Sequence, residues 1–176
     1  MPIAVLVVCG APLAQRIGDL VNAMRDAGWE TYVIGTPSSR AWIDNDLASA
    51  LGVRFDFRNP DQPKGVPTAD VVVVCPATFN TVNKVAVGIA DTYAASFVCE
   101  AIGTGIPIVI APMVNRKLWG HFNWSTSLDV LRRANVRFLD PRTGGVDVKP
   151  VESGTGDDVV RDFQPAWLVS AARAAL

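Results

Sequence analysis

The chain has 176 residues, of which 49% are hydrophobic and 19% charged, enough to form one folded domain over residues 1–176 with a substantial core. Its formal net charge is −1 and its basic residues are scattered, which argues against binding to nucleic acid or to an anionic membrane. We find no N-terminal signal pattern and no apolar run of about 18–20 residues, so we expect a cytoplasmic protein without a membrane span.

The first part of the chain alternates apolar runs with helical patterns. Residues 3–9 form a nearly continuous apolar run, typical of a strand buried on both faces of a parallel sheet. Residues 13–27 carry apolar side chains at helical spacing, and residues 31–34 predict a second strand. A helix is expected over residues 40–51, and a weaker third strand over residues 53–57.

The middle of the chain continues this alternation. Residues 71–75 are the clearest strand, because four valines and a cysteine follow one another. Helices are expected over residues 82–89 and 92–103, and residues 106–111 predict a fifth strand.

Patterns in the last third of the chain predict the remaining helices, a strand and a loop. Residues 128–134 resemble the end of a helix, and residues 136–139 a short last strand. Residues 140–156 are rich in glycine, proline and charge and predict a loop or flap, while residues 157–176 predict a closing helix. This alternation predicts an α/β fold in which helices cover both faces of a parallel sheet, a three-layer sandwich.

Small or polar residues follow three of the predicted strands, at positions 10–12, 36–39 and 76–81. Ligands of open α/β sheets collect at the carboxyl ends of the strands, where small residues allow a phosphate group to approach backbone N–H groups. A phosphate-bearing ligand is one interpretation. The other is that Ser38, Ser39 and Asn80 only cap helices.

Several familiar sites are not predicted. The glycine spacing matches neither the dinucleotide fingerprint nor a P-loop, so NAD and ATP are not expected. The three cysteines, Cys9, Cys75 and Cys99, have no metal-binding or disulfide spacing. His121 is the only histidine, and we interpret it as a surface residue rather than a member of a catalytic triad.

Three segments, in order and spacing, resemble motifs of the homo-oligomeric flavin-containing cysteine decarboxylases, which include phosphopantothenoylcysteine and lantibiotic-peptide cysteine decarboxylases. Residues 76–81 (P-A-T-F-N-T) are similar to P-A-S-A-N-T, and residues 88–91 (G-I-A-D) to the start of G-x-x-D-N. Residues 112–119 (P-M-V-N-R-K-L-W) are similar to P-x-M-N-x-x-M-W. Together these motifs are far more specific than any one of them.

The resemblance implies a flavodoxin-like (Rossmann-like) fold, FMN as the cofactor, no metal, a small-molecule or peptide substrate, and a homotrimer or a higher multiple of trimers. By this resemblance the FMN phosphate and ribityl chain would be held by Gly10, Ala11, Pro12, Ser38 and Ser39. Thr78, Phe79, Asn80 and Thr81 would line the cofactor, and the Met113 backbone would lie near the isoalloxazine. Asn115 would bind the substrate carboxylate, since a leaving carboxylate needs a fixed amide donor.

The sequence also departs from the family pattern. Counting back from Pro76 places Gln62 at the position of the family's catalytic histidine, and glutamine has no proton to exchange near pH 7. Pro150 stands about where phosphopantothenoylcysteine decarboxylases carry a flap cysteine, before Gly154 and Gly156. Phe79 replaces a small alanine beside the flavin.

Three functions remain open at this point. The first is an FMN-dependent enzyme that oxidises or decarboxylates a thiol- or carboxylate-bearing substrate. The second is a non-catalytic FMN-binding regulatory or accessory subunit. The third is a relative of the flavin prenyltransferases, which share the fold but match residues 115–119 less well.

Overall fold

Five parallel strands form one sheet in the order β2-β1-β3-β4-β5. The computed structural model describes residues 1–61 and 65–176. The strands are β1 (Ile3–Val8), β2 (Glu30–Gly35), β3 (Val71–Ala77), β4 (Ile108–Pro112) and β5 (Arg137–Phe138). This order is that of flavodoxin-like folds, so the predicted fold class is confirmed.

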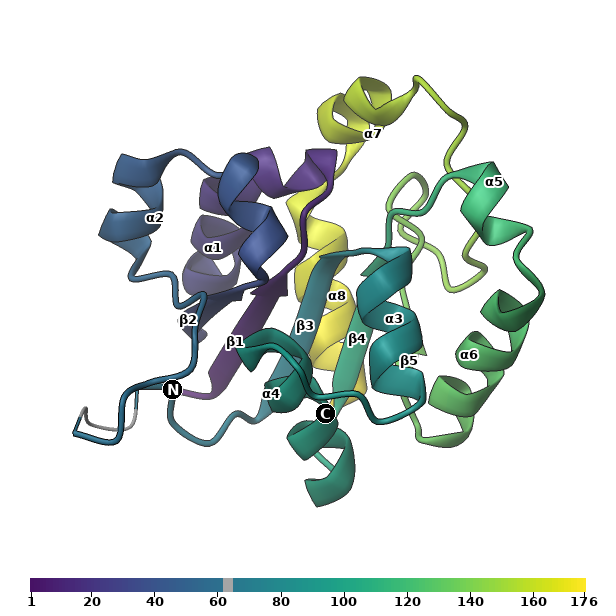
Figure 1. The fold of residues 1–176 in the computed structure, drawn as a ribbon. Coiled ribbons are helices and arrows are strands. Elements are labelled where there is room, and N and C mark those ends of the chain that lie inside the picture. The colour runs from purple at the N-terminus through teal and green to yellow at the C-terminus, as the bar shows by residue number, and fades with distance from the viewer. Residues whose placement is uncertain (62–64) are drawn as a thin grey trace.

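Helices cover both faces of the sheet (Figure 1). The α-helices are α1 (Ile17–Asp26), α2 (Asn45–Leu51), α3 (Phe79–Ala86), α4 (Tyr93–Thr104), α5 (Arg116–Trp119), α6 (Phe122–Arg133), α7 (Gly156–Asp162) and α8 (Pro165–Ala175). Two short 3₁₀ helices, η1 (Pro12–Arg16) and η2 (Pro37–Ala41), follow the first two strands. Among the residues that the structure describes, no helix is long and apolar enough to cross a membrane.

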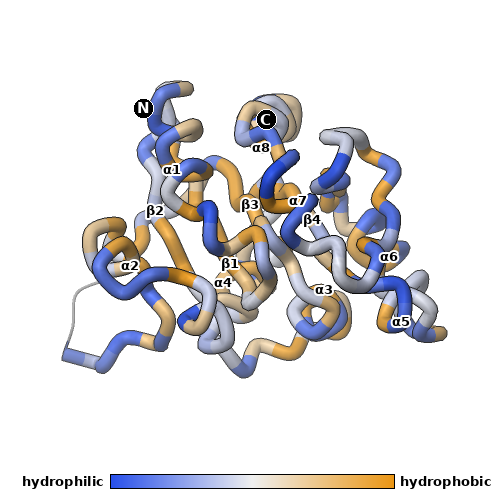
Figure 2. The backbone as a smooth tube through the Cα atoms, turned by 90° about the horizontal axis from the view of Figure 1, so that it is seen from above, coloured by the Kyte–Doolittle hydropathy of each residue, from blue (hydrophilic) through white to orange (hydrophobic). Residues whose placement is uncertain are grey.

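The strands divide the core into two parts because successive side chains point to opposite faces. Leu6 and Val8 pack with residues of α1 and α8, whereas Val5 and Val7 pack with residues of α3, α4 and α6. Every residue of β3 and β4 is buried, as expected for strands covered on both faces. Figure 2 shows that β1 and β3 run largely through hydrophobic residues.

The strand predicted over residues 53–57 is wrong. Only Arg54 pairs with the edge of β2: its N–H donates to the Val33 carbonyl at 3.1 Å and its carbonyl accepts from Gly35 at 2.8 Å. The chain then leaves the sheet, and Asp56 and Phe57 are exposed. Because the pairing stops after this single bridge, residues 53–57 do not form a strand.

The closing helix predicted over residues 157–176 is also wrong as one element. It is divided into α7 and α8, and Phe163 and Gln164 between them have extended backbone angles. Pro165 explains the break, because a proline disfavours helical geometry in the residue before it and is well tolerated in the first turn of a helix.

Smaller differences concern where helices begin. The predicted helix over residues 13–27 begins with a 3₁₀ turn at Pro12 that continues directly into α1. The helix predicted over residues 40–51 is not continuous, because η2 ends at Ala41 and α2 begins at Asn45, where the Asp44 side chain caps it. Helix α3 begins at Phe79, three residues before the predicted start at 82, because the Thr78 side chain caps it. These changes bring the first turns of η1, η2 and α3 to the carboxyl ends of the strands.

Candidate functional site

The loops after β1 and β2 are in direct contact at the carboxyl edge of the sheet. A Cβ atom built on Gly10 would lie 2.8 Å from both the Ser38 carbonyl oxygen and its Oγ, closer than real Cβ contacts. The Oγ atoms of Ser38 and Thr36 are 3.1 Å apart. Residues 10–12 and 38–39, which are predicted to hold the FMN phosphate and ribityl chain, can therefore meet only because residue 10 is a glycine.

The two serines of η2 have different surroundings. Ser39 is fully buried, and its hydroxyl donates to the Thr36 carbonyl at 2.7 Å. Ser38 is exposed at the surface of the same turn. Of the two hydroxyls, only that of Ser38 lies where it could reach a ligand, while Ser39 stabilises the turn.

The loop after β3 lies beside the loop after β1. Cys9 donates its N–H to the Pro76 carbonyl at 3.0 Å, and Met113 donates to the Ala77 carbonyl at 2.8 Å. Thr78 Oγ1 accepts the Thr81 N–H at 3.4 Å. Backbone hydrogen bonds thus connect the carboxyl ends of β1, β3 and β4, where the predicted site segments begin.

Beneath this edge lies a buried thiol. The Cys9 side chain interacts with the side chains of Thr81 and Thr78, and burial raises its pKa despite these hydrogen bonds. A fully buried thiol with a raised pKa is protonated at neutral pH and is a poor nucleophile. Cys9 therefore belongs to the floor of the site rather than to its chemistry.

Phe79 belongs to an aromatic cluster that the sequence analysis missed. Its ring stacks on Trp124 at 5.5 Å and meets the edge of His121 at 5.6 Å, and Trp119 lies 5.1 Å from Trp124. His121 is exposed, as predicted, and its Nδ1 accepts the Asn123 N–H at 3.2 Å. Phe79, which stands where the family motif has an alanine, therefore packs from the start of α3 against Trp124 of α6.

Asn115 follows β4 and caps the short helix α5. Its Oδ1 accepts the Leu118 N–H at 3.0 Å, and the residue is exposed. Within the described part of the chain, no hydrogen bond involves its Nδ2 group. Capping and ligand binding are compatible here, because the cap uses the oxygen and leaves the amide donor for an anion.

The predicted flap crosses the site. Val151 donates its N–H to the Val114 carbonyl at 2.8 Å, and its own carbonyl accepts from Arg116 at 3.2 Å. Further along, a Cβ atom on Gly156 would meet Pro12 at 3.1 Å and Met113 at 3.8 Å. The flap therefore lies against two of the predicted cofactor-binding residues and beside Asn115.

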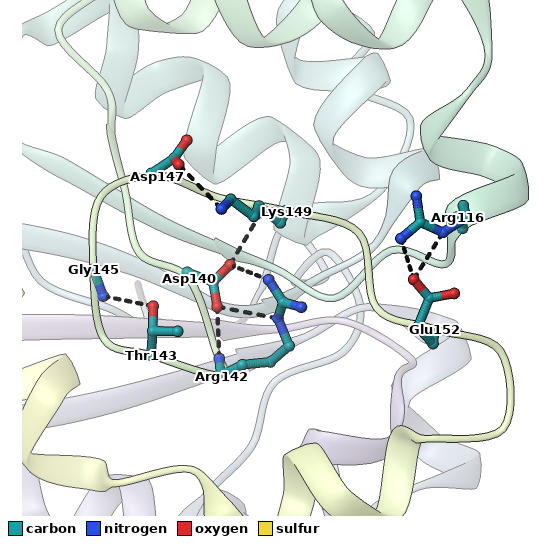
Figure 3. Close-up of polar contacts among 8 residues, drawn as sticks. All are labelled: Arg116, Asp140, Arg142, Thr143, Gly145, Asp147, Lys149 and Glu152. Atoms are coloured by element: carbon teal, nitrogen blue, oxygen red, sulfur yellow. Dashed lines mark hydrogen bonds and ion pairs between the residues drawn. The ribbon is translucent and has the colours of Figure 1, made fainter.

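The base of the flap is held by Asp140, which the sequence analysis did not identify. This fully buried carboxylate accepts hydrogen bonds from the Arg142 side chain and N–H and from the Lys149 N–H at 2.8–3.3 Å (Figure 3). Burial alone raises the pKa of Asp140, but these hydrogen bonds together hold it below its ordinary value. A carboxylate in an otherwise ordinary D-P-R sequence offered no signal of this role.

A hollow of about 1200 Å³ lies along α4. Tyr32, Phe57, Tyr93 and Phe97 contribute to its lining. None of the residues predicted to hold the cofactor contributes to its lining. The position predicted for the catalytic histidine of the family, Gln62, lies outside the described residues.

The chain is similar in sequence and in structure to several known proteins. Coenzyme A biosynthesis bifunctional protein CoaBC of Thermococcus kodakarensis is 39% identical over 74 residues, 42% of this chain and 18% of the relative. The probable phosphopantothenoylcysteine decarboxylase of Streptococcus mutans is 23% identical over 163 residues, 88% of this chain and 90% of the relative. The structure of the FMN-dependent cysteine decarboxylase SpaF matches with a TM-score of 0.68 at 26% identity and covers 98% of both chains.

The chain spans only 18% and 36% of the CoaBC proteins from Thermococcus kodakarensis and Bacillus subtilis. The Flavoprotein family matches residues 2–161, which is most of the chain. The resemblance predicted from the three motifs is confirmed, and the chain belongs to the Flavoprotein family.

Proposed function

We propose that the chain binds FMN at the carboxyl edge of its sheet. The observation that carries this proposal is the close contact between Gly10 and Ser38, which joins two predicted phosphate-side segments at the place where flavodoxin-like folds bind ligands. The residues present suit the group, since Ser38 offers a hydroxyl and Pro12 and Met113 offer apolar surface. Membership of a flavoprotein family supports the same cofactor.

Around this cofactor we assign roles as follows. The FMN phosphate and ribityl chain lie at residues 10–12 and at Ser38, with Ser39 supporting the turn from below. Residues 78–81 line the cofactor, and the Met113 backbone faces the isoalloxazine. Asn115 holds the substrate carboxylate through its Nδ2 donor, while its oxygen continues to cap α5.

The reaction that we propose is the oxidation or decarboxylation of a small molecule or peptide that carries a thiol or a carboxylate. When bound, FMN would accept the two electrons of an oxidation; in a decarboxylation the carboxylate would leave as carbon dioxide, and the electron pair of the broken carbon–carbon bond would stay on the product, which takes up a proton. The protein fixes the carboxylate with a neutral amide, which avoids placing two negative charges together. The decarboxylase relatives support this class of substrate.

The alternative is a non-catalytic FMN-binding subunit. The observation that favours it is the glutamine at the position of the family's catalytic histidine, because the ordinary acid–base group is then absent. The third function, flavin prenyl transfer, is less well supported because residues 115–119 follow the decarboxylase motif.

Purification tests the proposal. We expect a yellow protein with one FMN per chain, released on denaturation and identified by its absorbance and mass. Reduction of this flavin by a thiol-bearing carboxylate, with release of carbon dioxide, distinguishes the enzyme from the accessory subunit. A colourless protein that also takes up no added FMN would overturn the proposed cofactor.

A further inference from the structure

The flap contains a short segment, residues 149–155, that we call the strap. Its two ends are held firmly. At the first end, the Lys149 N–H donates to the buried Asp140 carboxylate at 3.0 Å. After the second end, the Arg16 guanidinium donates to the Val160 and Phe163 carbonyls of the α7 region, both at 2.8 Å. Hydrogen bonds thus fix the chain at the start of the strap and just after its end.

The middle of the strap is held by two backbone hydrogen bonds of Val151, by the buried Val151 side chain and by one exposed ion pair. Val151 makes a single backbone bridge to Asn115, and the Glu152 carboxylate pairs with the Arg116 guanidinium. Arg116 Nε donates to Glu152 Oε1 at 2.7 Å, and Nη2 donates to the same oxygen (Figure 3). Beyond Glu152 the strap continues through exposed Ser153 and Gly154.

The ion pair between Arg116 and Glu152 lies at the surface, where another anion can take the place of the Glu152 carboxylate. The two side chains remain 66% and 51% exposed, so another anion can reach the guanidinium without moving the core. Exposed ion pairs of this kind contribute little to stability, because water competes for both partners. A ligand carboxylate in the same position could accept the same hydrogen bonds from the guanidinium as the Glu152 carboxylate does.

The position of Arg116 makes this exchange relevant to the site. It follows Asn115 directly, and its own N–H takes part in the bridge that brings the strap to Asn115. A planar guanidinium offers parallel donors that match the two oxygens of a carboxylate. Both side-chain hydrogen bonds go to the same oxygen of Glu152, so the pair does not use the matched two-oxygen geometry that a carboxylate can offer.

We propose that Arg116 is a second anchor for the substrate carboxylate, beside the Asn115 amide, and that Glu152 occupies this anchor until substrate displaces it. The inference rests on the proposed function, because it assumes that a carboxylate-bearing thiol enters this site. It adds a specificity determinant: substrates that lack the carboxylate cannot displace Glu152. The Glu152 side chain is then displaced only by ligands of this class.

The test uses two probes that differ by one group: N-acetyl-L-cysteine, and N-acetylcysteamine, which lacks the carboxylate. Binding to the purified flavoprotein is followed by the absorbance of its flavin, for the wild type, Glu152→Gln and Arg116→Gln. Asp129→Asn removes a comparable exposed pair with Arg132 on α6 and serves as the control. All these positions are on the surface, so the variants are expected to fold.

We expect Glu152→Gln to bind N-acetyl-L-cysteine about two- to fivefold more tightly, since the competing carboxylate is gone. Arg116→Gln should bind it about tenfold more weakly, through the loss of charge-assisted hydrogen bonds. Neither variant should change the binding of N-acetylcysteamine, and Asp129→Asn should behave as wild type. Unchanged or weaker binding of N-acetyl-L-cysteine by Glu152→Gln would overturn the proposal, as would equal effects on both probes.

Hydrogen exchange gives a second readout that does not depend on the flavin. Both variants should accelerate exchange of the Val151 N–H, and N-acetyl-L-cysteine should accelerate it in the wild type only. Unaltered exchange in both variants would refute the role of the ion pair. A protein without flavin would instead refute the proposed function, so the two failures are distinguishable.

Discussion

At the scale of single residues, Gly10 is a position in the candidate site that admits no side chain without movement of the backbone. A methyl group there would lie 2.8 Å from the backbone oxygen of Ser38 and 2.9 Å from its carbonyl carbon, and backbone atoms cannot move as a side-chain end can. The two loops must separate to admit any side chain.

Gly10→Ala is therefore expected to lower the free energy of unfolding by about 1–3 kcal/mol and to weaken FMN binding by about tenfold or more. The matched control is Gly103→Ala, since a Cβ atom at Gly103, inside α4, would meet nothing within 4 Å. That control should be neutral or slightly stabilising, because alanine favours a helix. Denaturant unfolding and FMN titration measure both effects, and equal behaviour of the two variants would contradict the packing argument.

Asn115→Asp separates capping from ligand binding. Aspartate keeps an oxygen for the Leu118 N–H, so thermal stability should be unchanged. It lacks the amide donor and adds a negative charge, so binding of a carboxylate-bearing thiol should fall by about tenfold or more. If this variant keeps both flavin binding and full activity, Asn115 has only the capping role.

At the scale of elements, the base of the flap depends on the ionised state of Asp140. Its pKa in the folded chain lies below its ordinary value, which is near 3.9 in unfolded chains. The carboxylate therefore stabilises the fold above that unfolded-state pKa, and the contribution is lost as the pH falls through the lower folded-state pKa.

Asp140→Asn should accordingly lower the free energy of unfolding by about 1–3 kcal/mol at pH 7. The difference between the variant and the wild type should begin to shrink below about pH 4, where the carboxyl of the unfolded wild-type chain takes up a proton, and it should be lost below the lower pKa of the folded state. Denaturant unfolding at a series of pH values measures this difference. A difference that stays constant down to pH 2 would show that the charge has no part in it.

The elements that could be predicted from sequence are those whose pattern is local. The valine run of β3 and the apolar run of β1 predicted both strands because buried parallel strands need continuous apolar residues. Residues 53–57 misled the prediction, because whether an apolar segment pairs depends on a distant strand edge. The division between α7 and α8 was foreseeable from Pro165.

The site was predictable only in part for the same reason. The strand-end segments were identified from small residues and family motifs, and the structure brings residues 10–12 and 38–39 together. The contacts of the flap join residues far apart in sequence, such as Arg116 and Glu152, and no local pattern marks them. Nor did the sequence distinguish the exposed Ser38 from the buried Ser39.

At the scale of the whole molecule, we propose that the chain assembles as a trimer or a multiple of trimers. The resemblance to homo-oligomeric flavin-containing cysteine decarboxylases motivates this, because it implies an FMN site shared between subunits. We expect light scattering to give three times the mass of the chain or a multiple of it, with dilution causing loss of FMN. A monomer that keeps full FMN occupancy would contradict the proposed assembly.

The central claim is the position of the cofactor, and a crystal structure of the FMN complex tests it most directly. We expect the phosphate beside residues 10–12 and Ser38, and the isoalloxazine beside Phe79 and the Met113 backbone, with Asn115 facing its edge. FMN bound instead in the hollow along α4, or away from Gly10 and Ser38 altogether, would contradict the account.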